Sequence, residues 1–290
     1  MRKALLPIIF LLVLVSCTAT RNIGTNAKTQ LWDLSQLSPE ELKMANELLT
    51  YGLEHEALYT LLDTLKPISS LGYALSFPLA KDAEMKDGDK AVVSFEADSS
   101  KMALDELKKW NNVLEALSTE DLEFLLVPFK QTWEGKRNLQ ILVCRTDLMN
   151  TQISKKAYFF GQWGFTANSN LATVLTTIEF ESRNDRYRAY GYLFGYPEHA
   201  VDFFVAASIS EEETGEFVNR NFFSIPVAKG ESGHFTYAIP KDYIPDQRDS
   251  SIYFQATHTL NKYNMIKSQY TTESGALDAI SLITDYRKSQ

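Results

Sequence analysis

Two histidines in this 290-residue chain have neighbours that suit acid–base chemistry. His55 and Glu56 lie in a segment with tyrosines four residues before and after the histidine, so a helix would place the three rings on one face. His199 and Asp202 follow the chain break at Gly195-Tyr196-Pro197. Because imidazole titrates near neutral pH, a histidine beside a carboxylate can pass a proton. His55, Glu56, His199 and Asp202 are therefore catalytic candidates; the alternative is that they hydrogen-bond at the edge of a core.

A second set of residues has the charge pattern of an anion-binding site. Arg145 and Asp147 come just after an apolar strand, where sites in α/β sheets gather. Tyr196 and Arg186, with Arg183 and Arg188, lie near the start of a predicted helix, and helix N-termini with arginines favour carboxylate or phosphate. The alternatives are that Asp147 caps the next helix while Arg145 pairs with a surface acid, and that Tyr196 fills a packed corner.

Motifs for metal or nucleotide chemistry are incomplete in this sequence. The His55-Glu56 helix has Tyr59 where a zinc-protease motif has its second histidine. The segment Gly230-Glu-Ser-Gly233 is one residue short of a nucleophile elbow and falls in a predicted hairpin turn. A phosphate-binding glycine loop is absent from the sequence. We therefore predict neither a metal site nor a cofactor.

The elements that would position these residues are mostly helices. Ser38-Pro39-Glu40-Glu41 predicts a capping box that opens a helix ending near Leu65, before Lys66-Pro67. Leu139 to Cys144 is the clearest strand, and Thr146 or Asp147 can cap the helix after it. Further helices are expected at 99–117, 118–127, 146–160, 168–181, 184–194, 197–205, 252–266 and 276–283, and weaker strands at 70–79 and 90–97.

A hairpin is predicted from 222–227 and 234–239, and Pro226 would confine its first strand to an edge, because proline cannot donate to a ladder. The expected fold is therefore a mixed α/β (α+β) domain, rich in helix, with a small sheet and an edge hairpin.

The amino-acid composition limits the classes of partner that the chain can bind. The formal charge of the chain is −8, and 44% of its residues are hydrophobic, which indicates a well-filled core. An acidic chain without a basic block is a poor candidate for binding nucleic acid. Cys144 lies inside the apolar strand, so we expect a buried structural thiol.

The N-terminus has the pattern of an export signal. Arg2 and Lys3 precede the apolar run from Ala4 to Val15, which is too short to span a bilayer. The ending Leu14-Val-Ser-Cys17 resembles the lipobox of bacterial lipoproteins. That resemblance implies cleavage before Cys17, acylation of Cys17 by fatty acids such as palmitate, and a membrane anchor; a signal peptide cut at another position is the alternative. Without Arg2 and Lys3 the chain has 27 basic and 37 acidic residues, a net charge of −10.

We expect a signal peptide over residues 1–16, a lipidated cysteine and flexible tether over 17–35, and one globular domain over 36–290. Thr18 follows the cysteine where aspartate would indicate inner-membrane retention, so the resemblance implies the outer membrane of a bacterial cell envelope. The tethered domain is expected to bind a ligand or a protein partner, which the sequence does not identify. The alternative is a tethered, hydrolase-like enzyme whose histidines and carboxylates converge only in the fold.

Overall fold

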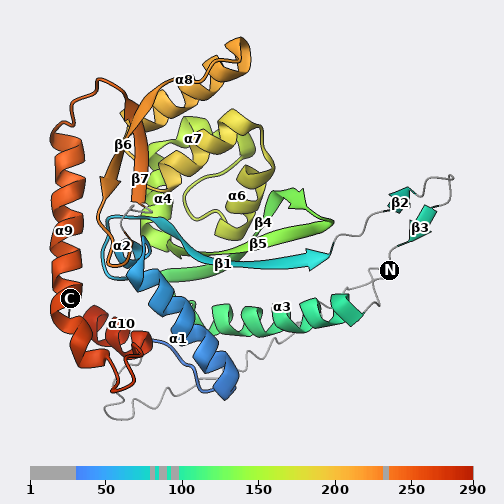
Figure 1. Ribbon diagram of the computed structural model, residues 1–290, viewed down its shortest axis with the longest axis vertical. Helices are drawn as coiled ribbons and strands as arrows, with labels where there is room; N and C mark the ends of the chain where they lie inside the picture. The colour runs from blue at the N-terminus through green and yellow to red at the C-terminus, as the bar shows by residue number, and fades with distance from the viewer. Residues whose placement is uncertain (1–30, 79–81, 85–89, 93–97, 231–234, 290) are drawn as a thin grey trace, which may run out of the picture. The chain divides into compact units, whose positions relative to one another are not determined.

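The computed structural model describes residues 31–78, 82–84, 90–92, 98–230 and 235–289. Residues from Leu31 onward form one compact unit. The described part of this unit is rich in helix and contains small antiparallel sheets (Figure 1), which confirms the predicted α+β class. None of its helices is both long enough and apolar enough to cross a membrane.

A three-stranded antiparallel sheet stands at the centre, in the order β1 (Ile68–Pro78), β5 (Lys136–Arg145) and β4 (Leu122–Trp133). The middle strand, β5, contains the apolar run that the sequence marked as its clearest strand. Because side chains alternate along a strand, Ile141 and Val143 enter one core while Leu142 and Cys144 enter the other. The Cys144 thiol is fully buried, as expected, and burial raises its pKa.

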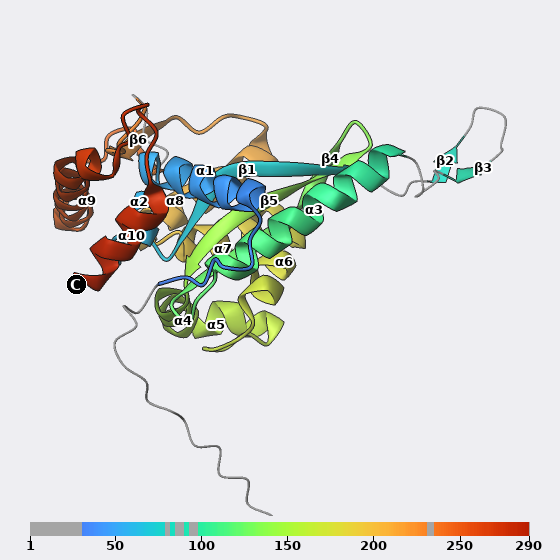
Figure 2. The same cartoon turned by 90° about the horizontal axis from the view of Figure 1, so that it is seen from below.

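Helices α1 (Pro39–Glu54) and α3 (Asp98–Leu117) cover one face of this sheet (Figures 1 and 2). The predicted capping box of α1 is present: Ser38 Oγ accepts from the Glu41 backbone N–H at 3.3 Å, and Glu41 Oε2 accepts from the Ser38 backbone N–H at 2.8 Å. Leu48 of α1 and Leu114 of α3 belong to the same core cluster as Val143.

The opposite face packs against a succession of helices that follow β5. They are α4 (Thr146–Lys155), α5 (Ala157–Phe160), η1 (Gly161–Trp163), α6 (Leu171–Phe180), α7 (Arg183–Leu193) and α8 (Glu198–Thr214). Met149 of α4 and Ile178 of α6 share a core cluster with Leu142 and Cys144. The predicted break at Gly195-Tyr196-Pro197 separates α7 from α8.

The predicted hairpin forms a second antiparallel sheet, β6 (Arg220–Ile225) and β7 (Phe235–Pro240), which packs between α8 and α9 (Gln247–Lys267). Pro226 follows the last residue of β6, so the missing N–H lies outside the ladder. The remaining elements are α2 (Leu58–Leu61), β2 (Asp82–Glu84), β3 (Lys90–Val92), η2 (Ser268–Tyr270) and α10 (Ala279–Lys288).

Two predicted helices are wrong. The helix from Ser38 ends at Glu54, because His55 adopts an extended conformation, and a separate short helix follows. Residues 122–133 form strand β4 instead of continuing a helix from Ser118, because Leu122 and Phe124 enter the core when β4 pairs with β5.

The structure also bears on three predicted boundaries. Thr146 and Asp147 lie inside the first turn of α4, whose N-cap is Arg145, so neither caps it. Trp32 is only 2% exposed and belongs to the main core, and the compact unit begins at Leu31. The strand expected at 90–97 is present over β3, and its residues 93–97 lie outside the described residues.

Candidate functional site

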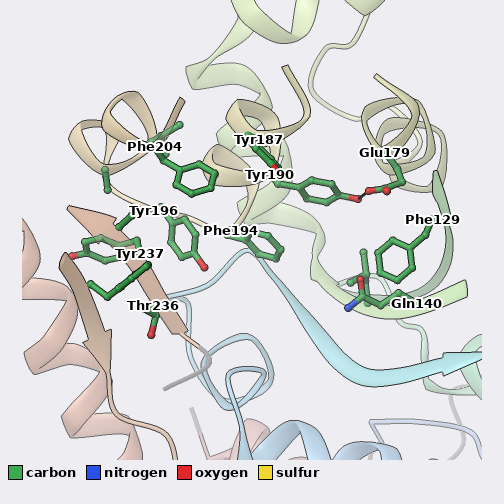
Figure 3. Close-up of a pocket in the computed structure, with 16 residues that line it drawn as sticks. Phe129, Gln140, Glu179, Tyr187, Tyr190, Phe194, Tyr196, Phe204, Thr236 and Tyr237 are labelled. Carbon is green, nitrogen blue, oxygen red and sulfur yellow. Dashed lines mark hydrogen bonds between the residues drawn. The ribbon is translucent and has the colours of Figure 1, made fainter. Parts of the chain in front are cut away.

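A cavity of about 390 Å³ opens between the central sheet, α6, α7, α8 and the β6–β7 hairpin (Figure 3). This volume is within the range of small-molecule sites. Aromatic rings form half of its lining: Phe129, Tyr187, Tyr190, Phe194, Tyr196, Phe204, Phe222 and Tyr237. The cavity therefore presents flat, mainly apolar surfaces.

Helical spacing explains how α7 and α8 supply one wall. Tyr187, Tyr190 and the C-cap residue Phe194 lie three and four residues apart, so their rings continue one face of α7 that points into the cavity. Ala200 and Phe204 repeat the four-residue spacing on α8. The two helices pack closely, because a side chain at Gly191 would place its Cβ 2.8 Å from Val201.

The turn between α7 and α8 sets the position of two lining rings, Phe194 and Tyr196. Gly195 between them has φ of 77°, a conformation that disfavours other residues. A Cβ at this position would also lie 2.9 Å from the Cδ of Pro67. The Tyr196 backbone N–H donates to Gly191 O at 3.1 Å, which closes the turn.

The sheets supply the remaining walls. Gln140 and Leu142 are two residues apart on β5, so both side chains lie on the cavity face of the central sheet. Phe222 of β6 is paired in register with Ala238 of β7, and both line the cavity. Phe222 is 63% exposed, so its ring stands at the solvent side of the site.

The carboxylate at the cavity wall is held by protein groups. Glu179 is buried and accepts from the Tyr190 hydroxyl at 3.0 Å, drawn as a dashed line in Figure 3, and from the Lys130 backbone N–H at 3.1 Å. Arg186 Nη1 lies 3.5 Å from Glu179 Oε1. Burial, with the charge of Glu179, raises the pKa of Tyr190, so this hydroxyl stays a hydrogen-bond donor. The network orients the wall and leaves Glu179 little freedom to act as a base.

A buried lysine lies behind two of the lining rings. The Lys66 ammonium is 2.7 Å from Glu56 Oε2, and it lies 5.0 Å and 5.8 Å from the ring centroids of Phe194 and Tyr196 and 4.4 Å from that of Phe235. Burial lowers the pKa of Lys66, and the charge of Glu56 opposes that shift. From the sequence, Lys66 is expected only as part of a helix stop, because nothing local pairs it with Glu56.

The first pair of catalytic candidates is separated by the end of α1. His55 stacks on Tyr51 with ring centroids 4.1 Å apart, and its Nδ1 is 2.9 Å from Tyr51 O. Glu56 instead turns inward to Lys66. Tyr59 lies in α2 and donates its hydroxyl to Pro226 O. The three rings expected on one helix face are therefore divided between two elements.

The second pair of catalytic candidates, His199 and Asp202, lies on α8, and the two side chains contact different partners. His199 Nε2 is 3.3 Å from Asp249 Oδ1, and the imidazole stacks on Tyr243 at 4.9 Å. Asp202 is held by Arg188 at 2.5 Å. The sequence did not indicate Asp249 as a partner, because 50 positions separate it from His199.

Asp249 is the acceptor of a buried network beside the cavity. It accepts from the hydroxyls of Tyr237 at 2.5 Å and Tyr243 at 2.8 Å and from the Asp246 backbone N–H at 2.9 Å. Burial acts to raise the pKa of Asp249, but these hydrogen bonds and the charge of His199 lower it overall. The network fixes Tyr237, a lining residue.

The anion-site candidates are distributed over several places. Arg145 Nη1 donates to Asp63 O at 3.0 Å, and its Nε is 3.7 Å from Asp147. Tyr196 lines the cavity, whereas Arg186 pairs with Glu179.

The arginines expected around the start of α8 lie elsewhere. Arg183 is 3.6 Å from Glu212, near the far end of that helix, and Arg188 pairs with Asp202 in its second turn. The cation at the first turn is Lys156, 2.5 Å from Glu198. The expectation that these arginines and the α8 N-terminus form one anion site thus has no geometric support.

Among the described residues, no group of three or more histidine, cysteine, aspartate or glutamate side chains is arranged to hold a metal ion. No family model matches the chain, and comparisons with curated proteins and with solved structures found no similar protein.

Proposed function

We propose that this chain is a lipid-anchored protein of the bacterial cell envelope whose domain binds an apolar small molecule in the aromatic cavity. The observation that carries the binding proposal is the lining itself. Eight aromatic residues enclose a volume suited to a small ligand, and the wall carboxylate Glu179 is held by Tyr190, Arg186 and a backbone N–H.

The site offers mainly shape and ring surface to a ligand. Burial of apolar area, together with stacking on rings, supplies affinity without directional bonds. The Glu179 and Asp249 networks hold Tyr190 and Tyr237 in place, so two of the rings are positioned before a ligand enters.

Binding of N-phenyl-1-naphthylamine, a neutral fluorescent probe, tests this proposal. We expect saturable fluorescence enhancement with one site per chain. Phe222→Ala removes a ring from the cavity edge and should weaken binding about fivefold. Phe254→Ala is the matched control, because Phe254 is 69% exposed on α9 and does not line the cavity. Unsaturable binding, or equal losses in both variants, would contradict the proposal.

The anchor rests on Leu14-Val-Ser-Cys17 and has its own test. Cys17→Ala should abolish incorporation of a fatty-acid analogue and leave an uncleaved or mislocalised precursor. Cys144→Ala is the matched control, since Cys144 is buried in β5. Equal labelling of wild type and Cys17→Ala would refute the anchor and leave the cavity proposal intact.

A further inference from the structure

A polar cavity adjoins the aromatic one. It has a volume of about 380 Å³ and is lined by Lys130, Gln131, Glu181, Arg183, Arg186 and Tyr187. Tyr187 lines both cavities, and Glu179 of the aromatic cavity contacts Arg186 of the polar one. Tyr187 and the Glu179–Arg186 pair therefore lie where the two cavities meet.

The lining of the polar cavity is cationic. It has three basic side chains, Lys130 from β4 and Arg183 and Arg186 from α7, and one carboxylate, Glu181. The Glu181 carboxylate accepts from the Trp163 indole N–H at 2.8 Å. Glu179 pairs with Arg186 and Glu212 with Arg183, so these two cations are partly neutralised by carboxylates just outside the lining.

Lys130 is the cation with the most freedom to meet a ligand. Its ammonium donates to Glu181 O at 2.8 Å, and no carboxylate of the described residues lies within ion-pairing distance of it. Arg183 is 3.6 Å from Glu212, and both side chains of that pair are about half exposed, so the contact is weak. Both groups can therefore turn to an anion at small cost.

The start of α7 lies at the same place. Arg183 is the first residue of this 11-residue helix, whose positive dipole end adds to the charge of the side chains. The acidic residue of the first turn, Asp185, is bonded to the N-cap Ser182 hydroxyl at 2.9 Å and does not line the cavity.

We propose that the ligand is an anionic amphiphile, whose apolar body lies in the aromatic cavity while its carboxylate or phosphate head binds Lys130, Arg183 and Arg186 beyond Tyr187. This inference rests on the proposed function and specifies its ligand class. A neutral molecule would fill only the first cavity, so the head group adds affinity and orientation.

Displacement of N-phenyl-1-naphthylamine by three ligands with the same chain tests the proposal: dodecanoate, dodecyl phosphate and dodecan-1-ol. We expect the better of the two anions to bind about tenfold more tightly than the alcohol at low ionic strength, and to lose part of this advantage in added salt. The preferred anion identifies the head group as carboxylate or phosphate.

Lys130→Gln should reduce the preference for the anion over the alcohol about fivefold while leaving the affinity for dodecan-1-ol unchanged. Lys262→Gln, an exposed lysine on α9, is the control and should leave both affinities unchanged. Equal affinity of wild type for the alcohol and both anions would overturn the amphiphile inference alone. Absence of binding by the probe and by dodecan-1-ol would instead overturn the proposed function.

Discussion

At the scale of single residues, Lys66 stands out because its charged side chain is buried among aromatic rings. Its side chain is fully buried, its ammonium contacts one carboxylate, and aromatic ring faces lie around it. A buried ion pair adds little net stability over an apolar pair, whereas removing one partner leaves an uncompensated buried charge. Loss of Glu56 would therefore leave an unpaired ammonium next to the rings of Phe194 and Tyr196.

Lys66→Met should lower the free energy of unfolding by about 3–5 kcal/mol, because Glu56 would remain buried without its partner. The double variant Lys66→Met/Glu56→Gln should recover most of this loss, since the amide oxygen can still accept from the Ser70 backbone N–H, as Glu56 Oε1 does at 3.2 Å. Urea unfolding of the three proteins measures this. A single variant as stable as wild type would show that the pair is dispensable.

Asp249 gives a prediction about pH. Its pKa is lower in the folded protein than in the unfolded chain, so its stabilising contribution is complete above the unfolded value of about 3.9 and is lost as the pH falls through the folded value. Asp249→Asn should therefore make thermal stability less sensitive to acid below about pH 4. Melting temperatures across this range test it, with the exposed Asp242→Asn expected to keep the wild-type acid dependence.

At the scale of elements, the sequence predicted the helices and strands whose local sequence signals agree with their tertiary contacts. The capping box of α1, the apolar strand β5 and the break between α7 and α8 all appear where the sequence indicated. The polar run at Ser118 resembled a helix start, but the pairing of residues 122–133 with β5 overrode it. The two strands are consecutive and join at the turn Glu134-Gly135, where both residues have positive φ, so the local signal for β4 was a hairpin turn and not helical periodicity.

The turn between α7 and α8 leads to a prediction about the cavity wall. Gly195→Ala should destabilise the protein more than Gly215→Ala. Both glycines have positive φ, which costs about 1–2 kcal/mol for alanine, but only Gly195 lies against Pro67, whereas nothing lies within 4 Å of a Cβ at Gly215. Gly195→Ala should also weaken probe binding, because Phe194 and Tyr196 flank it. Thermal melts and probe titrations of both variants test this; equal effects would contradict it.

At the scale of the whole molecule, the described core extends to the first residues of the compact unit. Trp32 is buried with residues from α1, α3 and α9 although it precedes the first helix. A chain that starts at Leu31 should therefore be more stable than one that starts at Ser35, by about 3–5 kcal/mol, the usual loss for a buried tryptophan. Denaturant unfolding of the two chains tests this, and Trp32→Ala in the longer chain should reproduce the loss. Identical midpoints would show that Trp32 adds no stability.

The sequence by itself determined the acidic charge, the helix-rich α+β class and the buried character of Cys144, and it predicts an export signal that ends before Cys17. Among the site candidates, it offered Tyr196 as a ligand-binding residue, with a packed corner as the alternative, and His199 as a proton-transfer residue. Only the tertiary structure assembled the cavity, because Phe129, Tyr190, Phe204 and Phe222 come from four elements. The pairs Lys66–Glu56 and His199–Asp249 also form only in the folded chain. The electrostatic energy of each pair depends on burial and on the distance between its atoms, and spacing along the sequence indicates neither.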